Sequence, residues 1–492
     1  MNPLKQLFGQ TAIYGFGTVV PRLLNYLLLT PFFTRVFDLD EYGIITELYA
    51  YVVFLMIILT YGMETGFFRF AQSQKDDKKV FSTTLIPIFV SSLSFIILMR
   101  IFSLPIARTL GYEQHPEFII WIGIIVGVDA FTAIPFALLR WYNKAAKFVG
   151  IKIASVVLNI GLNFLFLLLL PSLASSGSEI WLMKIYNAEI GVGYVFISNV
   201  ISSLFTLLLL SGTIIRVKPV FDRGLWIKMI GYSLPLLISG LAGTVNEALD
   251  RVLLKHLLKN PESALAQLGI YGANYKIAVL MTLFIQMFRY AGEPFYFANA
   301  NKANARIIFA QVMKYFVIAS LLIFLVVNLF IDLFKYFIGS AFHEGLYIVP
   351  VILFANLLLG IYFNLSIWYK LNNLTKYGAM ITIMGALITF LINWFFIPIY
   401  GYIASAWAHV ACYGCMVIIS WLIGRKYYPI HYPIRSIGLY MALAGIIYYI
   451  STLTLALNMV PEMVINTGLL AGFIIIVIFF EKISISSLRF EE

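Results

Sequence analysis

Apolar segments long enough to cross a lipid bilayer recur along this chain from one end to the other. A helix needs about 20 consecutive apolar residues to span the hydrocarbon core, which is about 30 Å thick. Of the 492 residues, 61% are hydrophobic and only 12% are charged, whereas soluble domains carry roughly 25% charged residues. The runs are continuous and do not alternate, which excludes a membrane β-barrel. The sequence therefore predicts an all-α, polytopic helical membrane protein.

Hydropathy predicts about 14 transmembrane helices joined by short loops. They are expected near 10–34, 43–70, 80–103, 118–140, 148–170, 189–215, 230–257, 268–297, 307–333, 347–369, 377–397, 402–424, 436–456 and 460–481. None of the loops is long enough for a separate folded domain. That brevity argues against a membrane-bound enzyme with a large domain outside the bilayer.

Lysine and arginine residues concentrate in one set of alternate loops, which fixes the expected orientation. This set includes Lys78, Lys79, Arg140, Lys144, Lys147, Arg216, Lys218, Arg223, Lys228, Lys302, Arg306, Lys370, Lys376, Arg425 and Lys426. The positive-inside rule places these loops, and with them both termini, in the cytoplasm. We attribute the formal net charge of +11 to this topology and to attraction for anionic lipids. No nucleic-acid partner is expected.

The second and eighth predicted spans repeat each other. When the sequence is shifted by 229 residues, segment 42–72 lies over 271–301 without a gap. Identical residues then coincide at Tyr42 and Tyr271, Gly43 and Gly272, Tyr61 and Tyr290, Glu64 and Glu293, Phe68 and Phe297, and Ala71 and Ala300. Both copies run in the same direction through the membrane. The sequence thus predicts two parallel halves related by an axis along the membrane normal, as in some transporters.

Charged residues at membrane depth are concentrated in the first two spans of each half. They are Arg22, Glu47 and Glu64 in one half and Glu247, Asp250, Arg251, Lys276, Arg289 and Glu293 in the other. Each such charge costs a few kcal/mol on insertion and normally faces a cavity or a partner. Glycine and proline residues in the same spans, including Gly62, Pro21, Pro31, Pro235 and Pro294, are expected to break or bend them.

Two of these charges have no opposite charge within a helical turn, namely Arg22 and Lys276, and they are the candidates for binding an anionic group. Arg22 lies about 18 Å into its span at the helical rise. Two pairs have the i,i+4 spacing that permits mutual neutralisation, Glu247 with Arg251 and Arg289 with Glu293. Glu47 lies near the outer surface, where its carboxylate is expected to snorkel to water.

Motifs of soluble enzymes are missing from the sequence. It has neither a Walker A loop nor an HExxH zinc motif. Cys412 and Cys415 form a single CxxC inside an apolar span, which is a poor metal site without further ligands. The sequence therefore predicts a protein that is not an enzyme and holds neither a cofactor nor a metal.

The opening GTVVPRLLNYLLLTPFFTRVFDLDEYGIITELYAY and the later stretches SGLAGTVNEALDRVLLKHLL and LGIYGANYKIAVLMTLFIQMFRYAGEP carry a family likeness. They resemble polysaccharide flippases of the multidrug/oligosaccharidyl-lipid/polysaccharide (MOP) exporter superfamily. The resemblance implies two pseudo-symmetric six-helix lobes, 1–217 and 218–425, followed by two C-terminal helices in 426–492. It further implies a location in the bacterial inner membrane.

The resemblance also implies a function. A polyprenyl-diphosphate-linked oligosaccharide is expected to move from the cytoplasmic to the outer leaflet by alternating access. Arg22, Lys276 and Arg289 are expected to bind the diphosphate, since cations must replace its hydration. Glu64, Glu247, Asp250 and Glu293, and less directly Glu47 and Arg251, are candidates for gating or for coupling to a proton or sodium gradient. Membrane lipids and components of polysaccharide polymerisation or export are the implied partners.

Three alternatives stay open at this point. A lipid II flippase of peptidoglycan synthesis shares the helix number and the cationic cavity. A drug or cation antiporter of the same superfamily favours twelve spans and an acidic cavity, with no need for Arg22. A glycosyl polymerase belongs to a different class, against which the short loops and repeated halves argue.

Overall fold

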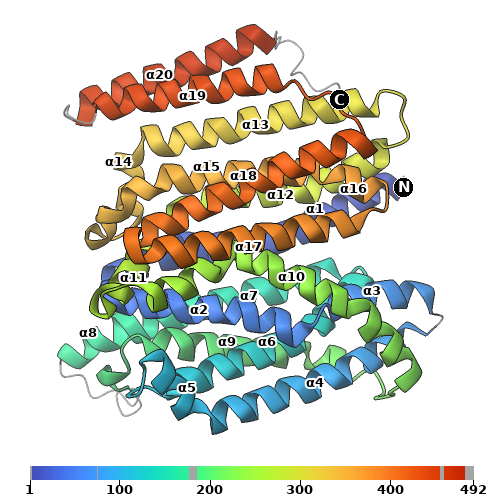
Figure 1. Cartoon of the computed structure of the whole chain (residues 1–492). Coiled ribbons are helices and arrows are strands. Elements are labelled where there is room, and N and C mark those ends of the chain that lie inside the picture. Colours follow the sequence, from blue (N-terminus) through green and yellow to red (C-terminus); the bar gives the residue numbers. More distant parts are fainter. Residues whose placement is uncertain (1–2, 75, 177–185, 455–458, 482–492) are drawn as a thin grey trace. The chain divides into compact units, whose positions relative to one another are not determined.

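The computed structural model describes residues 3–74, 76–176, 186–454 and 459–481, and every regular element in these ranges is helical (Figure 1). The α-helices are α1 (Pro3–Val36), α2 (Leu39–Thr60), α3 (Met63–Ser73), α4 (Asp77–Ile101), α5 (Ser103–Leu110), α6 (Glu117–Trp141), α7 (Ala145–Phe164), α8 (Leu170–Ser175), α9 (Gly193–Ile214), α10 (Arg223–Leu257), α11 (Ala264–Ile277), α12 (Val279–Asn299), α13 (Ala305–Leu329), α14 (Ile331–Phe334), α15 (Val349–Leu365), α16 (Ile367–Leu371), α17 (Thr375–Tyr400), α18 (Tyr402–Tyr427), α19 (Ile434–Thr454) and α20 (Met459–Glu481).

The predicted fold class is confirmed. In the described part of the chain, 12 helices are long and apolar enough to cross a membrane, or 13 when the bent pair α11 and α12 is taken as one span. The first expected span corresponds to α1, which is 34 residues long. A helix is therefore present at every segment in which hydropathy predicted one.

Two of the predicted spans are not single helices. The segment expected as one helix over 43–70 is divided into α2 and α3, because Tyr61 (φ 31°) and Gly62 (φ 71°) adopt the left-handed conformation that ends α2. The segment expected over 268–297 bends by 49° between α11 and α12. The prolines do not mark these breaks: α1 runs uninterrupted through Pro21 and Pro31, and α10 through Pro235.

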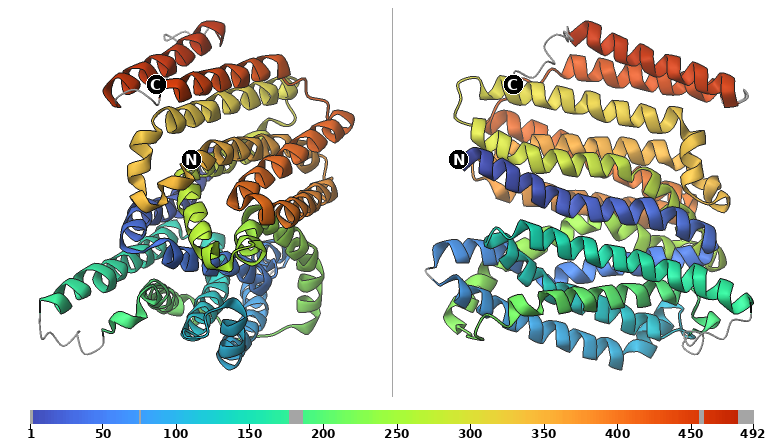
Figure 2. Two further views of the ribbon diagram at one scale, coloured as in Figure 1. Left: turned by 60° about the vertical axis from the view of Figure 1, so that its left-hand side comes forward. Right: turned by 180° about the vertical axis from the view of Figure 1, so that it is seen from behind.

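The chain forms two compact units. The first unit contains 1–272 and 382–402, and the second contains 273–381 and 403–492. In the first unit, α6 packs on α4 and α9, α7 packs on α1 and α9, and α2 packs on α6 and α10 (Figure 2). In the second unit, α13 packs on α15, α19 and α20, and the last two helices also pack on each other.

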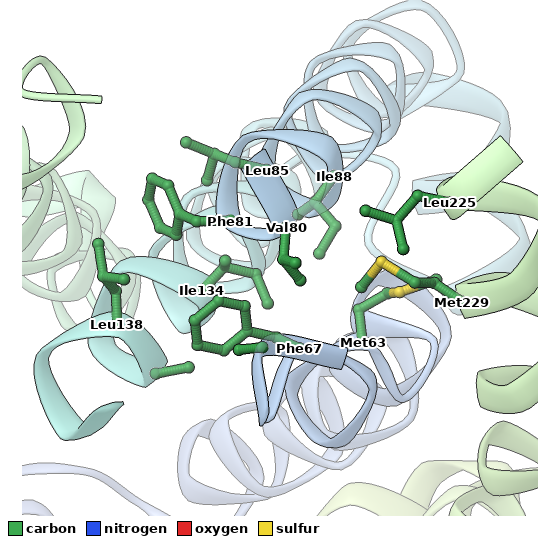
Figure 3. Packing of buried hydrophobic residues seen from close by; sticks show 12 residues of the cluster. Met63, Phe67, Val80, Phe81, Leu85, Ile88, Ile134, Leu138, Leu225 and Met229 are labelled. Carbon is green, nitrogen blue, oxygen red and sulfur yellow. The ribbon is translucent and has the colours of Figure 1, made fainter. Parts of the chain in front are cut away.

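The internal repeat is visible in the packing of the two halves. In the first half, Phe67 of α3 meets Phe81 of α4 edge to face, with ring centroids 6.3 Å apart (Figure 3). In the second half, Tyr296 of α12 meets Phe309 of α13 in the same way, at 4.9 Å. Tyr296 follows Phe67 by the 229 residues of the sequence repeat. The two aromatic pairs therefore lie at corresponding positions of the sequence repeat.

The ends of α6 and α16 repeat each other as well. Asn143 (φ 54°) and Asn373 (φ 55°) are both left-handed. The amide of Lys144 donates to the carbonyl of Leu139 at 2.8 Å, and the amide of Leu374 donates to that of Tyr369 at 2.7 Å. Both turns are Schellman motifs, in which asparagine takes the place usually held by glycine. The positive loops after these helices thus share one backbone design.

Glycines allow α2 and α11 to cross closely. A Cβ atom on Gly43 would lie 2.2 Å from the carbonyl oxygen of Leu265, and one on Gly269 would lie 2.1 Å from that of Leu39. Backbone oxygens cannot rotate away as side chains do, so only glycine fits at these positions. Small residues at helix crossings are typical of membrane proteins, where close backbone approach drives packing.

We expect Gly269→Ala to destabilise the first unit by about 1–3 kcal/mol, the usual cost of overpacking. The control is Gly243→Ala in α10, where an added Cβ meets no atom within 4 Å. The measurement is the free energy of unfolding of both purified variants in mixed micelles. Equal stability of the two variants would contradict the close crossing.

Candidate functional site

Glu64 forms an ion pair with Arg140 inside the first unit. Because the helix restarts at Met63, Glu64 falls in the first turn of α3, where the helix dipole favours a carboxylate. Arg140 lies in the last turn of α6, and its Nη2 atom is 2.6 Å from Oε1 of Glu64. The guanidinium also lies 5.2 Å from the ring centroid of Phe68. The two side chains are 45% and 30% exposed, so solvent reaches the pair.

The second half contains the equivalent pair. Oε1 of Glu293, in α12, lies 2.7 Å from Nζ of Lys370, in α16. Glu293 follows Glu64 by 229 residues, and Lys370 follows Arg140 by 230. The predicted i,i+4 partner, Arg289, is more distant, at 4.0 Å from the same oxygen. The repeated glutamate of the sequence thus takes part in a repeated ion pair. Its cationic partners, Arg140 and Lys370, had been interpreted from the sequence only as positive-inside residues.

A group of charges surrounds Lys152 of α7 in the first unit. Lys152 interacts electrostatically with Asp129, Arg22, Arg140 and Glu64. Sequence reasoning missed Lys152, because it follows Lys144 and Lys147 so closely that the positive-inside rule accounts for it. Arg22 is exposed on α1, the helix that packs along α7. Arg22 therefore belongs to a mixed cluster with a net positive charge.

Lys276 and Arg289 belong to the second unit, and both side chains are exposed. Lys276 lies in the last turn of α11. The guanidinium of Arg289 lies 4.0 Å from the ring centroid of Phe363, a cation–π contact within the same unit. The aromatic ring thus contacts the flat face of the Arg289 guanidinium, whereas the N–H groups at its edge can donate hydrogen bonds. That geometry suits recognition of an anion.

The charges of α10 differ in burial. Asp250 is only 1% exposed, and it accepts a hydrogen bond from the hydroxyl of Tyr271 in α11. Glu247 is exposed on the same helix, and Arg251 is half-buried within electrostatic reach of Tyr42. The predicted pairing of Glu247 with Arg251 stays a prediction. Asp250 is thus a fixed acceptor, whereas Glu247 remains accessible.

Glu47 does not snorkel to water as expected. Its side chain is 0% exposed, and Nζ of Lys255 in α10 lies 2.7 Å from its Oε2 atom. The hydroxyl of Tyr112 donates to the same oxygen. Nζ of Lys255 also donates to the carbonyl of Leu110 at 2.6 Å. The Glu47 carboxylate is therefore buried by the loop after α5 and by helix α10. Its position along α2 had predicted contact with water.

Tyr112, between α5 and α6, remains protonated in this cluster. Burial of the phenol, together with the neighbouring charge of Glu47, raises the pKa of Tyr112 above its ordinary value. The phenol therefore keeps the proton with which it donates to Oε2 of Glu47. Among the described residues, no group of three or more His, Cys, Asp or Glu side chains is placed to hold a metal ion.

Comparison with known proteins agrees with this fold. The lipid II flippase MurJ, in an inward closed conformation, superposes with a TM-score of 0.69 at 15% identity, covering 97% of this chain and 99% of that chain. An inward-facing multidrug resistance MATE family transporter of the MOP superfamily gives 0.63 at 13% identity, covering 83% and 94%. A MATE structure in complex with MaD3S gives 0.59 at 14% identity, covering 85% and 94%.

The search of curated proteins gave no match. The sequence profile of a family described as "Polysaccharide biosynthesis protein" matches residues 8–292, which is more than half of the 492 residues. The chain therefore belongs to the polysaccharide biosynthesis protein family, and it has the fold of the MOP exporter superfamily.

Proposed function

We propose that this protein is a flippase that moves a polyprenyl-diphosphate-linked oligosaccharide from the cytoplasmic to the outer leaflet of the bacterial inner membrane. The family match supports a substrate of polysaccharide synthesis, and the fold supports a transporter. One observation carries the proposal: exposed cations lie within helices that are otherwise mostly apolar. They are Arg22 on α1 and Lys276 on α11. An oligosaccharide needs no such cations, but a diphosphate does.

In this proposal Arg22, Lys276 and Arg289 bind the diphosphate. All three side chains are exposed. Lys152 joins them as a further cation, because it shares an electrostatic cluster with Arg22. Charge-assisted hydrogen bonds from arginine are frequently bidentate and match phosphate oxygens in geometry. A lysine such as Lys276 or Lys152 acts on a phosphate as a point charge.

The acidic residues serve the conformational cycle in the same proposal. Glu64 and Glu293 act as gates, because each is held by a cation at the end of another helix of its own half. Glu247 is the accessible carboxylate for a proton or a sodium ion, with Arg251 as its modulator. Asp250 and Glu47 are buried and hydrogen-bonded, so we assign them to holding α10 in place.

A second candidate, a lipid II flippase, is favoured by one specific observation. The fold likeness to MurJ extends over 97% of this chain, which includes the C-terminal helices α19 and α20. The two candidates carry the same lipid diphosphate chemistry and differ in the attached sugar. Substrate competition in the assay below distinguishes them.

The test is translocation of a fluorescent polyprenyl-diphosphate oligosaccharide in proteoliposomes. We expect Arg22→Ala and Lys276→Ala each to slow translocation about tenfold, the effect of about 1.4 kcal/mol of lost binding. Lys426→Ala is the control, because Lys426 lies in the last turn of α18 within the predicted cytoplasmic loop. If both variants were present at normal protein levels and translocated the substrate at the wild-type rate, the proposed diphosphate site would be wrong. Competition by lipid II but not by lipid-linked oligosaccharide would assign the second candidate.

A further inference from the structure

A cavity of about 670 Å³ opens in the first unit between α4 and α10. It is lined by Pro87 and Val90 of α4, by Trp226, Ile230 and Leu234 of α10, and by Tyr61 at the break between α2 and α3. We call it the α4–α10 pocket. Its volume falls within the range of ordinary ligand sites, roughly 300–1,000 Å³.

The lining offers a ligand almost no hydrogen-bonding groups. The hydroxyl of Ser91 donates to the carbonyl of Ile88 at 3.1 Å, so it is already engaged. The other side-chain polar groups of the lining are the Tyr61 hydroxyl and the Trp226 indole N–H. An occupant must therefore be apolar where it touches these walls, because a polar group would lose its hydration without replacement.

One wall of the pocket runs along α10. Trp226, Ile230 and Leu234 lie one turn apart on a single face of α10, so the wall they form is ~12 Å long at the helical rise. One leaflet contributes about half of the 30 Å hydrocarbon core. In the orientation predicted by the positive-inside rule, the pocket runs from the cytoplasmic interface toward the middle of the bilayer. Its length and direction match the acyl chain of a cytoplasmic-leaflet lipid.

The rim at the predicted cytoplasmic end is basic. Arg216, Lys218 and Arg223 are all exposed. Asp76 and Asp77 lie at the start of α4, and Asp222 lies at the start of α10. The carboxylate of Asp222 is held by Lys79 at 2.8 Å, which also lowers the pKa of Asp222. Clusters of lysine and arginine at this level attract anionic head groups, by about 1 kcal/mol for each residue.

We propose that the α4–α10 pocket is a binding site for an anionic phospholipid, whose acyl chain fills the cavity and whose phosphate lies at the basic end, against Arg223. Because Tyr61 forms part of the wall, the bound chain packs against the left-handed turn from which α3 begins. None of the residues of the pocket is among the cations assigned to the transported diphosphate. The lipid site can therefore be tested independently of the proposed function.

Binding is measured on the purified full chain, by quenching of Trp226 with phosphatidylglycerol that carries brominated acyl chains. The lipid is titrated into phosphatidylcholine–detergent micelles, and the Trp226→Phe variant gives the background. We expect a saturable component that is lost in that variant. Arg223→Gln should weaken it about fivefold, the effect of losing about 1 kcal/mol of attraction from one rim charge.

A second pair of variants tests the cavity itself. Val90→Phe with Leu234→Phe narrows the pocket from both walls and should abolish the saturable component. Leu208→Phe on α9 is the matched control, because Leu208 is 67% exposed and lies outside the pocket. Equal quenching by brominated phosphatidylcholine would overturn the anionic specificity. Displacement of the quencher by equimolar polyprenyl phosphate, but not by unlabelled phosphatidylglycerol, would assign the pocket to the substrate chain and also overturn the proposal.

Discussion

Replacing Lys255 by methionine is expected to destabilise the first unit by about 3–5 kcal/mol, the cost of breaking a buried ion pair by removing one partner. Glu47 is fully buried and Lys255 is 14% exposed, so solvent cannot screen the carboxylate once the ammonium is gone. Tyr112 alone would remain as a donor to Glu47 Oε2. This change should produce the largest loss of stability of any single lysine substitution discussed for this chain.

The measurement is the free energy of unfolding in mixed micelles, with Lys228→Met as the control. Lys228 lies on the same helix and is exposed, so its replacement should cost less than about 0.5 kcal/mol. Adding Glu47→Gln to the Lys255 variant should restore much of the loss, because a buried charge is then replaced by a neutral amide. A single variant within about 1 kcal/mol of the wild type would contradict the buried pair.

The membrane explains why the fold could be predicted so fully from the sequence. A bilayer offers no partner for backbone polar groups, so each apolar run must form hydrogen bonds within itself as a helix. The interruption at Tyr61 and Gly62 could not be located in this way. Hydropathy averages over a window, whereas a helix ends where two residues adopt positive φ angles. Proline proved a poor guide, because α1 continues through Pro21 and Pro31.

The site was predicted unevenly, and the reason is the same for most misses. Arg140, Lys152 and Lys370 all lie near the predicted cytoplasmic ends of their helices, where the positive-inside rule already accounts for a cation. The sequence carries no signal that a boundary lysine also reaches a glutamate on another helix. The prediction for Glu47 was wrong for a different reason. The position of a residue along α2 does not indicate that Lys255 and the loop after α5 bury it.

The recurrence of Glu64 as Glu293 was visible because a polar identity stands out in an apolar alignment. The structure adds that each glutamate meets a cation at the end of the fourth span of its own half, Arg140 or Lys370. Each cation is followed by a left-handed asparagine. The same ion pair occurs next to the same backbone turn in both halves. We infer that the contact has the same role in each half. A topology signal alone would require only a positive charge in the loop.

Reversing one charge of either pair is expected to reduce translocation about tenfold, and reversing one in each pair about a hundredfold. Glu64→Lys places a cation beside Arg140, and Glu293→Lys does the same beside Lys370. Each pair is partly exposed, so screening limits the effect at one site to roughly 1–2 kcal/mol. Effects at sites that share no partner add in free energy, and they therefore multiply in rate.

The charge swap separates a working contact from a general loss of folding. Glu64→Arg combined with Arg140→Glu restores the attraction in the opposite sense, and it should recover most of the translocation lost in Glu64→Arg alone. Lys79 and Asp222 provide the matched control: they form an ion pair at 2.8 Å in the same unit, but position 308, at the repeat spacing from Lys79, holds isoleucine, so this pair is not repeated. Reversal at Asp222 should leave translocation within about twofold of the wild type, a difference of roughly 0.4 kcal/mol. A contact that acts in both halves must show the same loss and the same recovery with Glu293 and Lys370. Recovery in one half without the other would assign the function to that lobe and remove the argument from symmetry.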